Sequence, residues 1–458
     1  MAHFRRDFPM TTAIFTPGHL CGTAPVPPAK SEAHRALLLA ALGNTPVTLT
    51  GFPPPLCNDT LAMMDGIRGM GATVEQQGES LYITPAPKPV PGQPMVDCHV
   101  HACAAALRML IPAFLVRGQS VRFWLEPTLF RRPLDAFEPL IAAIGGTMER
   151  IPAGENGLCQ VIVTGWMKAG RYAIDGSGSS QFASGLLIAL AHAMDEHCQP
   201  APAHLTVTGP IVSRPYLDMT LSLMRRFAVR YAEGAEGEFD LTPRTGDSPA
   251  TVPVAGDWSQ AAVLLCAGAV GQEVWVSGLI NDETCTQGDA AIVDVLRRMG
   301  MVIEEREGLL RAVRPVTGLC PINLNCDNIP DIAPIIALTC ATIPGVSTLQ
   351  GVARLRIKEC DRLDATCHLL SQMGVTTEVQ DGGDTLIVHD GSSIHGGFEA
   401  DVSADHRMAM LLAVAGSIAD APITVHGVES LNKSWPGFLG SYGELLRLPC
   451  VKEVSGEA

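Results

Sequence analysis

One arrangement of hydrophobic and polar residues recurs six times along the chain. A run of small apolar residues is followed by a short alternating segment that ends in glycine or, in the second copy, in Glu126. The six segment ends read VTLTGF, RFWLEP, LTVTGP, VWVSGL, STLQGV and ITVHGV. The apolar runs predict buried helices, and the alternation predicts half-buried strands. Similarity at a regular spacing indicates a repeat architecture.

A second helix and a β-hairpin complete the repeated unit. Stretches such as GIRGMGATVEQQGESLYIT and VLRRMGMVIEEREGLLRAV join a helix end, marked by glycine, to two alternating segments. Ala228 stands at the glycine position of the third copy. Glycine commonly terminates helices, so these stretches predict a helix, a stop and a hairpin. We therefore expect an α/β protein of six βαβαββ units.

Length, composition and charge limit the possible classes of protein. The chain has 458 residues, and single cores stop growing near about 250–300 residues, so we expect two domains. Hydrophobic residues make up 47% and aromatic residues 5%, which favours a core of small and aliphatic side chains. The net charge of −15 argues against a nucleic acid or another general polyanion as partner. In a chain of this net charge, a local cluster of basic residues indicates a binding site for a small anion.

Cysteine usage and the chain start indicate the compartment. The fourteen cysteines include no CxxC pair and lie mostly in apolar runs, so we expect buried free thiols. The N-terminal stretch MAHFRRDFPMTTAIF has no apolar segment typical of a leader, and no run of 18 apolar residues occurs in the chain. We expect a cytoplasmic protein without a membrane segment.

Charged residues stand at the head of the first apolar run, PPAKSEAHRALLLAALG at 27–43. Ser31 as the N-cap, with Glu32 in the first turn, is one explanation. However, Lys30 and Arg35 are unfavourable at the positive end of a helix dipole. A bound anion explains these two cations better.

Polar residues recur in the same register in the other units. The helix starts carry Arg108, then Ser179, Ser180 and Gln181, then Asp257 and Ser259, then Asp331, and then Asp405, His406 and Arg407. A second polar position follows the strand ends at Asn58 and Asp59, Arg132, Ser213 and Arg214, Lys358, and Lys433. If the units surround a common axis, the helix N-termini converge and form an anion-binding cleft.

These motifs resemble those of the 5-enolpyruvylshikimate-3-phosphate synthases, a family of enolpyruvyl transferases. The similar stretches run along nearly the whole chain and are KSEAHRALLLAAL, LFRRPL, IDGSGSSQF, VSRPYLDMT, NIPDIAP, LRIKECDRL, ADHRMAM and NKSWPGF. The resemblance implies a two-domain inside-out α/β barrel, with helices buried and sheets outside, and three repeats in each domain. It divides the chain into one domain at 29–253 and a second at 1–28 and 254–458.

The resemblance also implies how the two substrates bind. Shikimate 3-phosphate is expected at Ser31, Arg35, Ser179, Ser180, Gln181, Ser213, Tyr216 and Lys358. Phosphoenolpyruvate is expected at Lys30, Arg132, Gln181, Arg362, Arg407 and Lys433. Guanidinium and ammonium groups suit the carboxylate and phosphate of phosphoenolpyruvate. No metal or other cofactor, nucleic acid or membrane is implied, and we expect a monomer.

The implied reaction transfers the enolpyruvyl group to the 5-hydroxyl of shikimate 3-phosphate and releases phosphate. Asp331 is expected to be the general base, and Lys30 and Glu359 are the candidate proton donors. A helix N-cap is the alternative role for Asp331. Asp361 is expected to pair with an arginine, and His406 to be a packed or orienting histidine.

Two departures from the family pattern leave the acceptor open. The Asn-x-Gly-Thr loop of the family falls on ACAA at 102–105, after a stretch that is longer than usual, and Arg354 stands where some relatives have asparagine. The alternative is an enolpyruvyl transferase that uses another phosphorylated alcohol or a nucleotide. If Ala104 occupies the glycine place, its methyl group also predicts tolerance to glyphosate, which inhibits this family at the phosphoenolpyruvate site.

Three other classes fit less well. The UDP-sugar enolpyruvyl transferases carry a loop cysteine that EPTLFRRP lacks. RNA 3′-terminal phosphate cyclases have similar repeats, but the acidic charge of this chain argues against RNA. A noncatalytic binding protein of the same fold would be separated from an enzyme by a turnover test.

Overall fold

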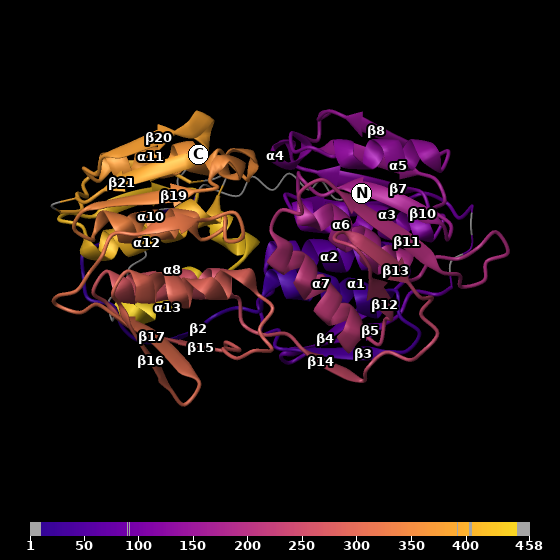
Figure 1. Ribbon diagram of the computed structural model, residues 1–458, viewed down its shortest axis with the longest axis horizontal. Helices are drawn as coiled ribbons and strands as arrows, with labels where there is room; N and C mark the ends of the chain where they lie inside the picture. Colours follow the sequence, from indigo (N-terminus) through magenta and orange to yellow (C-terminus); the bar gives the residue numbers. More distant parts are fainter. Residues whose placement is uncertain (1–10, 89, 91, 392, 403–404, 447–458) are drawn as a thin grey trace. The chain divides into compact units, whose positions relative to one another are not determined.

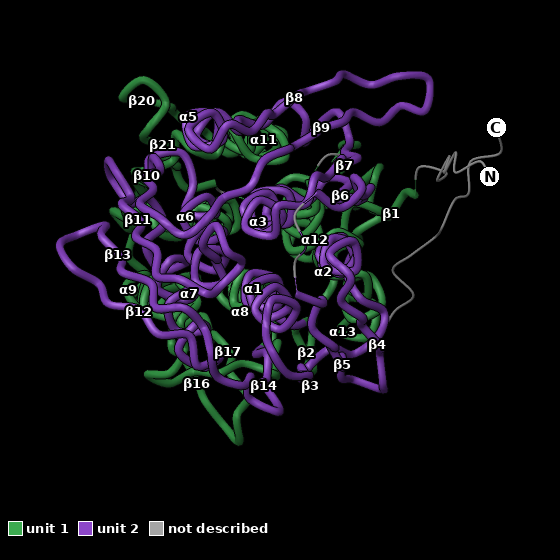
Figure 2. The backbone as a smooth tube through the Cα atoms, turned by 90° about the vertical axis from the view of Figure 1, so that its right-hand side faces the viewer, with its two compact units in different colours: residues 1–27, 256–458 green, residues 28–255 purple. Residues whose placement is uncertain are grey.

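The computed structural model describes residues 11–88, 90, 92–391, 393–402 and 405–446. The first ten residues, on which the expected absence of a leader rests, and Cys450 lie outside this part of the chain. The chain forms two compact units, residues 28–255 and residues 1–27 with 256–458 (Figure 2). In the described part of the chain, no helix is both long and apolar enough to cross a membrane.

The unit at 28–255 contains three four-stranded sheets, ordered β14-β3-β5-β4, β6-β7-β9-β8 and β10-β11-β13-β12. Its strands are β3 (Val47–Thr50), β4 (Thr73–Gln77), β5 (Ser80–Thr84), β6 (Val96–His101), β7 (Val121–Leu125), β8 (Thr147–Ile151), β9 (Cys159–Thr164), β10 (Arg171–Asp175), β11 (Ala203–Thr208), β12 (Tyr231–Glu233), β13 (Glu238–Leu241) and β14 (Thr251–Pro253). Its helices are α1 (Lys30–Ala41), α2 (Asn58–Gly69), α3 (Ala104–Val116), α4 (Pro127–Phe130), η1 (Asp135–Phe137), α5 (Glu138–Ala143), α6 (Ser180–Leu190) and α7 (Arg214–Arg226).

The other unit contains two four-stranded sheets, ordered β16-β17-β15-β2 and β18-β19-β21-β20, and a three-stranded sheet, β1-β23-β22. Its strands are β1 (Thr12–Phe15), β2 (Cys21–Pro25), β15 (Glu273–Ser277), β16 (Val302–Arg306), β17 (Leu309–Val313), β18 (Asn323–Asn325), β19 (Val346–Gln350), β20 (Thr377–Gln380), β21 (Thr385–His389), β22 (Glu399–Asp401) and β23 (Ile423–His426). Its helices are α8 (Trp258–Ala269), η2 (Gly288–Ala291), α9 (Ile292–Arg298), α10 (Ala333–Ala341), η3 (Ala353–Ile357), α11 (Arg362–Gln372), η4 (Asp381–Gly383), α12 (His406–Ile418), η5 (Val428–Lys433) and α13 (Phe438–Leu446).

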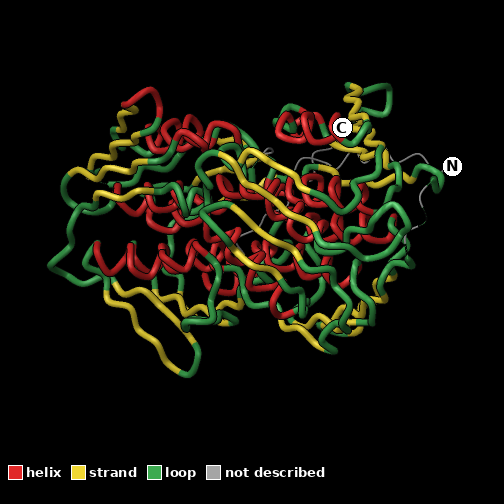
Figure 3. Tube along the Cα trace, turned by 45° about the vertical axis from the view of Figure 1, so that its right-hand side comes forward, coloured by secondary structure: helices red, strands yellow, loops and turns green. Residues whose placement is uncertain are grey.

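Helices form the centre of each unit and sheets cover them (Figures 1 and 3). Helices α3, α8, α10 and α12 are buried on almost every side, as expected for helices that are apolar all round. Strands such as β7 and β9 alternate between buried and half-buried positions, so one face of their sheet packs inward. A Cβ at Gly185 of α6 would lie 2.9 Å from the backbone oxygen of Arg108, so α3 and α6 approach closely there.

The six expected strand ends are confirmed as the ends of β3, β7, β11, β15, β19 and β23. The glycines that follow five of them have φ between 71° and 92°, which explains the repeated glycine. Glu126 has φ −73° and leads into α4, so this copy makes a turn that does not need glycine.

The sixth unit departs from the expected βαβαββ pattern. Five hairpins follow the pattern, but β23 pairs with β1 instead, with Thr12 opposite His426 and Phe15 opposite Ile423. Helices η5 and α13 follow β23 in the described residues. The N-terminal strand thus supplies the antiparallel partner, which the periodicity of the sixth copy could not reveal.

The expectation of buried cysteines is correct for part of the set. All thirteen cysteines in the described residues are free thiols, and seven of them are buried. Cys198 and Cys320 are exposed because each lies in a loop rather than in an apolar run of a helix or strand.

Candidate active site

The candidate residues lie in both units. In the unit at 28–255, helix α1 begins at Lys30 with Ala29 as its N-cap, so the interpretation of Ser31 as the N-cap was wrong. The ammonium of Lys30 lies 2.8 Å from Asp59 Oδ2, and the Asp59 side chain is only 6% exposed. Asp59, in the first turn of α2, therefore fixes Lys30 at the head of α1.

A neutral histidine supports this ion pair. His34 is fully buried, and its Nε2 lies 2.9 Å from the backbone oxygen of Asp59. Burial lowers the pKa of His34 to about 4, with Lys30 adding to the shift and Asp59 opposing it. His34 is uncharged near neutral pH, so it adds no positive charge beside Lys30.

Arg35 joins three helices in the core of the unit. Its guanidinium donates to Thr220 Oγ1 at 2.6 Å and to the backbone oxygens of Ser31 and Tyr216 at 2.7 and 3.1 Å. It also donates to Ser184 Oγ at 3.1 Å. Arg35 is 2% exposed, so these bonds tie α1 to α6 and α7 and leave little of the group for a ligand.

Two serines and a glutamine form the head of α6. Ser179 is the N-cap, and its Oγ accepts from the backbone N–H of Gln181 at 3.3 Å. Ser180 is the first helical residue and is 5% exposed. The side-chain oxygen of Gln181 accepts from Arg108 Nη1 at 3.1 Å, and Arg108 stacks on Phe182. Arg108 thus orients Gln181.

Ser213 and Tyr216 lie at the start of α7. Ser213 is its N-cap and has φ 52°, a left-handed conformation that is uncommon for serine. The backbone oxygen of Ser213 accepts from the N–H of Tyr216 at 3.0 Å. The helix start at the buried Ser213 is therefore a strained one.

The loop with the unusual sequence precedes α3. Ala104 is the first residue of α3, and the Cys103 Sγ caps the helix by accepting from the N–H of Ala106. The register between β6 and β7 shifts between His99 and His101, so a β-bulge takes up an extra residue just upstream. Arg132, the remaining candidate of this unit, follows α4 and is half-buried.

In the other unit, Arg362 is held by three carboxylates. Its Nε donates to Asp405 Oδ2 at 2.6 Å, its Nη1 to Asp331 Oδ1 at 2.7 Å, and its Nη2 to Glu359 Oε2 at 2.7 Å. The side chain is 2% exposed. Burial lowers the pKa of Arg362, but Asp405, Glu359 and Asp331 together hold it well above its ordinary value. The charge on Arg362 is permanent.

Two lysines extend the cluster from either side. Lys358 Nζ lies 3.1 Å from Asp331 Oδ1, and Lys433 Nζ lies 3.1 Å from Glu359 Oε1. Both ammonium groups are mostly buried. Burial lowers the pKa of Lys358, Asp331 raises it, and Arg362 lowers it again. Arg354 is close enough to lower it further, so Arg354 adds to the positive field here.

Asp331 is a partner of cations and not a helix cap. Helix α10 begins at Ala333 with Ile332 as its N-cap, so Asp331 lies just before the helix. Burial alone would raise the pKa of Asp331, but Lys358, Arg362 and Arg407 hold it well below its ordinary value. Asp331 is therefore ionised in this arrangement.

Arg407 lies at the start of α12. It is 8% exposed, and its Nη1 donates to the backbone oxygen of Ser259 at 2.8 Å. Its Nε has no hydrogen-bond partner among the described residues. The neighbouring His406 is 1% exposed, consistent with a packed histidine. Asp361 pairs with Arg356 at 2.7 Å, as expected.

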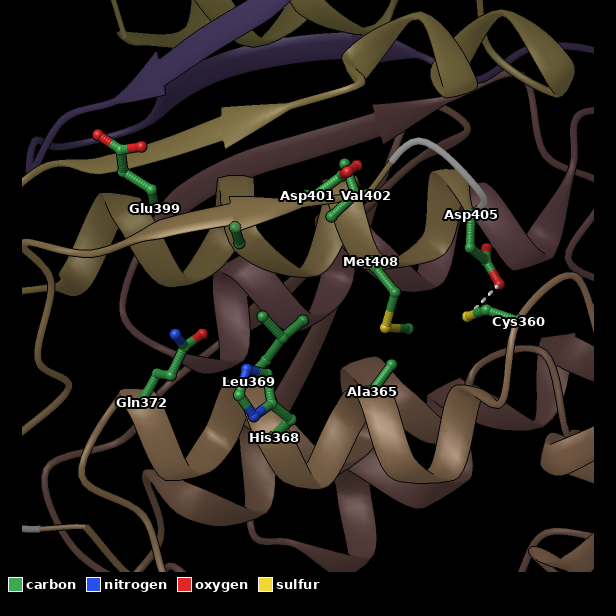
Figure 4. A pocket seen from close by; sticks show the side chains of 11 residues that line it. Cys360, Ala365, His368, Leu369, Gln372, Glu399, Asp401, Val402, Asp405 and Met408 are labelled. Carbon is green, nitrogen blue, oxygen red and sulfur yellow. Dashed lines mark hydrogen bonds between the residues drawn. The ribbon is translucent and has the colours of Figure 1, made fainter.

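A cavity of about 500 Å³ lies behind the Arg362 cluster, between α11, β22 and the start of α12 (Figure 4). Cys360 and Asp405 line one end, where the thiol lies 3.5 Å from Asp405 Oδ2. His368, Leu369 and Met408 are among the other residues that line it. Burial and the Asp405 charge raise the pKa of the Cys360 thiol, so it stays protonated and donates to Asp405.

The cluster in this unit can bind anions and hold a proton acceptor. Four cations, Lys358, Arg362, Arg407 and Lys433, accompany the carboxylates of Asp331, Glu359 and Asp405. Planar guanidinium groups suit carboxylate and phosphate oxygens, and buried charges act strongly in a low dielectric. Asp59, at a polar position after a strand end, and Asp405, at a polar helix start, were not expected among the site residues.

Comparison with known proteins gives the family. The EPSP synthase (3-phosphoshikimate 1-carboxyvinyltransferase) family matches residues 14–441. The 3-phosphoshikimate 1-carboxyvinyltransferases of Clostridium kluyveri and Clostridioides difficile are 31% and 30% identical to this chain. The matches cover 95% and 93% of this chain and 97% and 95% of the relatives.

Solved structures share the fold. The EPSP synthase of Acinetobacter baumannii has a TM-score of 0.72 at 22% identity, over 96% of this chain and 99% of its own. The enolpyruvyl transferase NikO of Streptomyces tendae has a TM-score of 0.71 at 18% identity, over 95% and 97%. These likenesses confirm the inside-out α/β architecture. By the match along nearly its whole length, the chain belongs to the EPSP synthase family.

Proposed function

We propose that the protein transfers the enolpyruvyl group of phosphoenolpyruvate to the 5-hydroxyl of shikimate 3-phosphate and releases phosphate. The reaction belongs to the shikimate pathway of aromatic amino acid biosynthesis. The observation that carries the proposal is the group of four cations around Asp331 and Glu359, of which Arg362 and Arg407 are buried, in a member of this family. We further infer that the enzyme is a cytoplasmic monomer with domains at 29–253 and at 1–28 with 254–458.

Each unit would contribute to substrate binding through polar residues at helix starts and after strand ends. In the unit at 28–255, these groups are Lys30, Ser31, Arg35, Arg132, Ser179, Ser180, Gln181, Ser213 and Tyr216. In the other unit, they are Asp331, Lys358, Glu359, Arg362, Arg407 and Lys433. Arg35 contributes mainly by holding α1, α6 and α7, because its donors already bind protein oxygens.

The proposed reaction has three proton transfers. Lys30 or Glu359 protonates the methylene carbon of phosphoenolpyruvate, and the 5-hydroxyl oxygen forms a bond to C2 while its proton passes to Asp331. The C2–oxygen bond to phosphate then breaks, and the new methyl group returns a proton to the group that protonated it, which restores the double bond. The hydroxyl proton held by Asp331 leaves with the phosphate, so the products are the enol ether and inorganic phosphate.

The low pKa of Asp331 is consistent with a base that is activated by substrate. Lys358 and Arg362 hold the carboxylate as an ion pair. An anionic substrate that binds these cations would weaken their effect on Asp331 and raise its pKa. The carboxylate would then accept a proton more readily at the moment when the hydroxyl is in place.

The choice of acceptor is tested by phosphate release. We expect release from phosphoenolpyruvate in the presence of shikimate 3-phosphate, and none with UDP-N-acetylglucosamine or a free nucleotide. Release with one of those acceptors but not with shikimate 3-phosphate would favour the alternative transferase, in line with the similar fold of NikO. A protein that releases no phosphate with any of these acceptors would be a noncatalytic member of the fold.

The role of Asp331 is tested by Asp331→Asn. The variant should fold and bind phosphoenolpyruvate but lose turnover by about 10²–10⁴-fold, the usual contribution of a general base. The matched control is Asp327→Asn, because Asp327 is exposed in the same loop before α10. Activity of Asp331→Asn within a few-fold of the wild type would remove Asp331 from the mechanism.

Inhibition by glyphosate tests the position of Ala104. We expect tolerance, because a methyl group at the glycine place overpacks the site, which costs about 1–3 kcal/mol, or about 5- to 150-fold in affinity. Phosphoenolpyruvate is shorter and should lose less affinity. Ala104→Gly should restore inhibition, whereas Ala106→Gly, two residues along the same helix, should not. Strong inhibition of the unmodified protein would contradict the steric explanation.

A further inference from the structure

One buried carboxyl group beside the cation cluster has no role in the proposed reaction. Asp289, in η2, is 2% exposed, and its Oδ2 accepts from Ser259 Oγ. Ser259 is the second residue of α8, whose N-cap is Asp257. Burial of a charged group is costly, so a buried carboxyl group calls for an explanation. The other partner of Ser259, which is Arg407, offers one.

Ser259 connects Asp289 to Arg407. The backbone oxygen of Ser259 accepts from Arg407 Nη1 at 2.8 Å. This is the guanidinium whose Nε has no hydrogen-bond partner among the described residues. The place of the guanidinium therefore depends on where the first turn of α8 lies.

Gln287 fixes the same turn next to η2. Its Oε1 accepts from the N–H of Trp258 at 2.9 Å, and its Nε2 donates to the backbone oxygen of Gly256 at 2.9 Å. Gln287 and Asp289 thus hold the start of α8 at two points, one on the backbone and one on the Ser259 side chain. Asp289 contacts Ser259 itself, the residue whose backbone oxygen accepts from Arg407.

We propose that Asp289 is a positioning residue that, through Ser259, fixes where Arg407 presents its guanidinium to the anionic substrate. The inference rests on the proposed function, in which Arg407 binds phosphoenolpyruvate. It adds a group that lies outside the repeated polar positions at helix starts and strand ends.

The charge of Asp289 links this position to pH. Burial and the nearby Asp331 raise the pKa of Asp289 to about 7, the Ser259 hydrogen bond and Arg407 lower it, and Asp257 raises it. Asp289 is neutral below that pH and becomes a second carboxylate near Asp331 above it. Because like charge repels an anionic ligand, the KM for phosphoenolpyruvate should rise as pH passes about 7.

The folded-state pKa also sets a stability trend. It lies above the ordinary value of an aspartate, so the folded state binds the proton more tightly than the unfolded state. Asp289 therefore contributes fully to the stability of the fold below the pKa that it has in the unfolded chain, and this contribution is lost as the pH rises to about 7. Asp289→Asn should remove this loss, which thermal denaturation across pH measures without any assay of turnover.

Three variants test the proposal by steady-state kinetics and calorimetry. Asp289→Ala and Ser259→Ala should each raise the KM for phosphoenolpyruvate by about tenfold, leave kcat within about threefold, and leave the KM for shikimate 3-phosphate unchanged. Asp289→Asn keeps an acceptor for Ser259, so it should match the wild type at pH 6 and lack the rise in KM above pH 7. Asp294→Asn, on the exposed face of α9, is the matched control.

Several results would overturn the proposal. One is an unchanged KM for phosphoenolpyruvate in Asp289→Ala and Ser259→Ala, and another is a loss confined to kcat. If Asp289→Ala fails to fold, Ser259→Ala decides. If the wild type binds phosphoenolpyruvate but releases no phosphate, only the proposed function is contradicted. The affinities of the wild type and the variants for phosphoenolpyruvate, compared by calorimetry, still test whether Asp289 positions Arg407. A wild type that does not bind phosphoenolpyruvate contradicts both.

Discussion

The contact between Arg362 and three carboxylates organises the candidate site of its unit. One guanidinium joins the start of α11 to the N-cap of α12 through Asp405, and to the segment before α10 through Asp331. Asp405 also accepts from the N–H of Arg407. Removal of one partner from a buried ion pair typically costs about 3–5 kcal/mol. The site and the packing of these helix starts therefore depend on the same contacts.

In the unit at 28–255, a buried arginine also joins several helices, but its hydrogen-bond partners are neutral. Arg35 donates to hydroxyl and backbone oxygens of α1, α6 and α7, so its hydrogen bonds go to neutral acceptors. Lys30 is paired with Asp59. One unit thus holds its main arginine among neutral donors and acceptors, and the other among carboxylates that include the proposed base.

The repeated features of the fold could be predicted from the sequence because each has a local cause. Alternation and glycine gave the six strand ends, and apolar runs gave the buried helices. The pairing of β1 with β23 joins residues more than 400 positions apart, so no local pattern contains it. Helix starts were also imprecise, because α1 begins before Ser31 and α10 begins after Asp331. The side chain of Asp331 is held by Lys358 and Arg362, which lie outside its helix.

Site residues at repeated positions could be found from the sequence, but their partners could not. Asp331 and Arg362 were expected, yet the burial of Arg362 under Asp405 depends on the packing of α11 against α12. Asp289 lies in a short helical turn between β15 and α9, where the six-fold pattern has no polar position. Nothing in its immediate sequence signals that its side chain reaches Ser259.

The most direct measurement is a crystal structure of the protein with shikimate 3-phosphate. The central claim is that the polar helix starts bind the substrates. The ligand phosphate should then contact the hydroxyls of Ser179, Ser180 and Ser213, with Gln181 and Tyr216 at the ring. A phosphate bound away from all three serines, at full occupancy and with both units ordered, would contradict the claim.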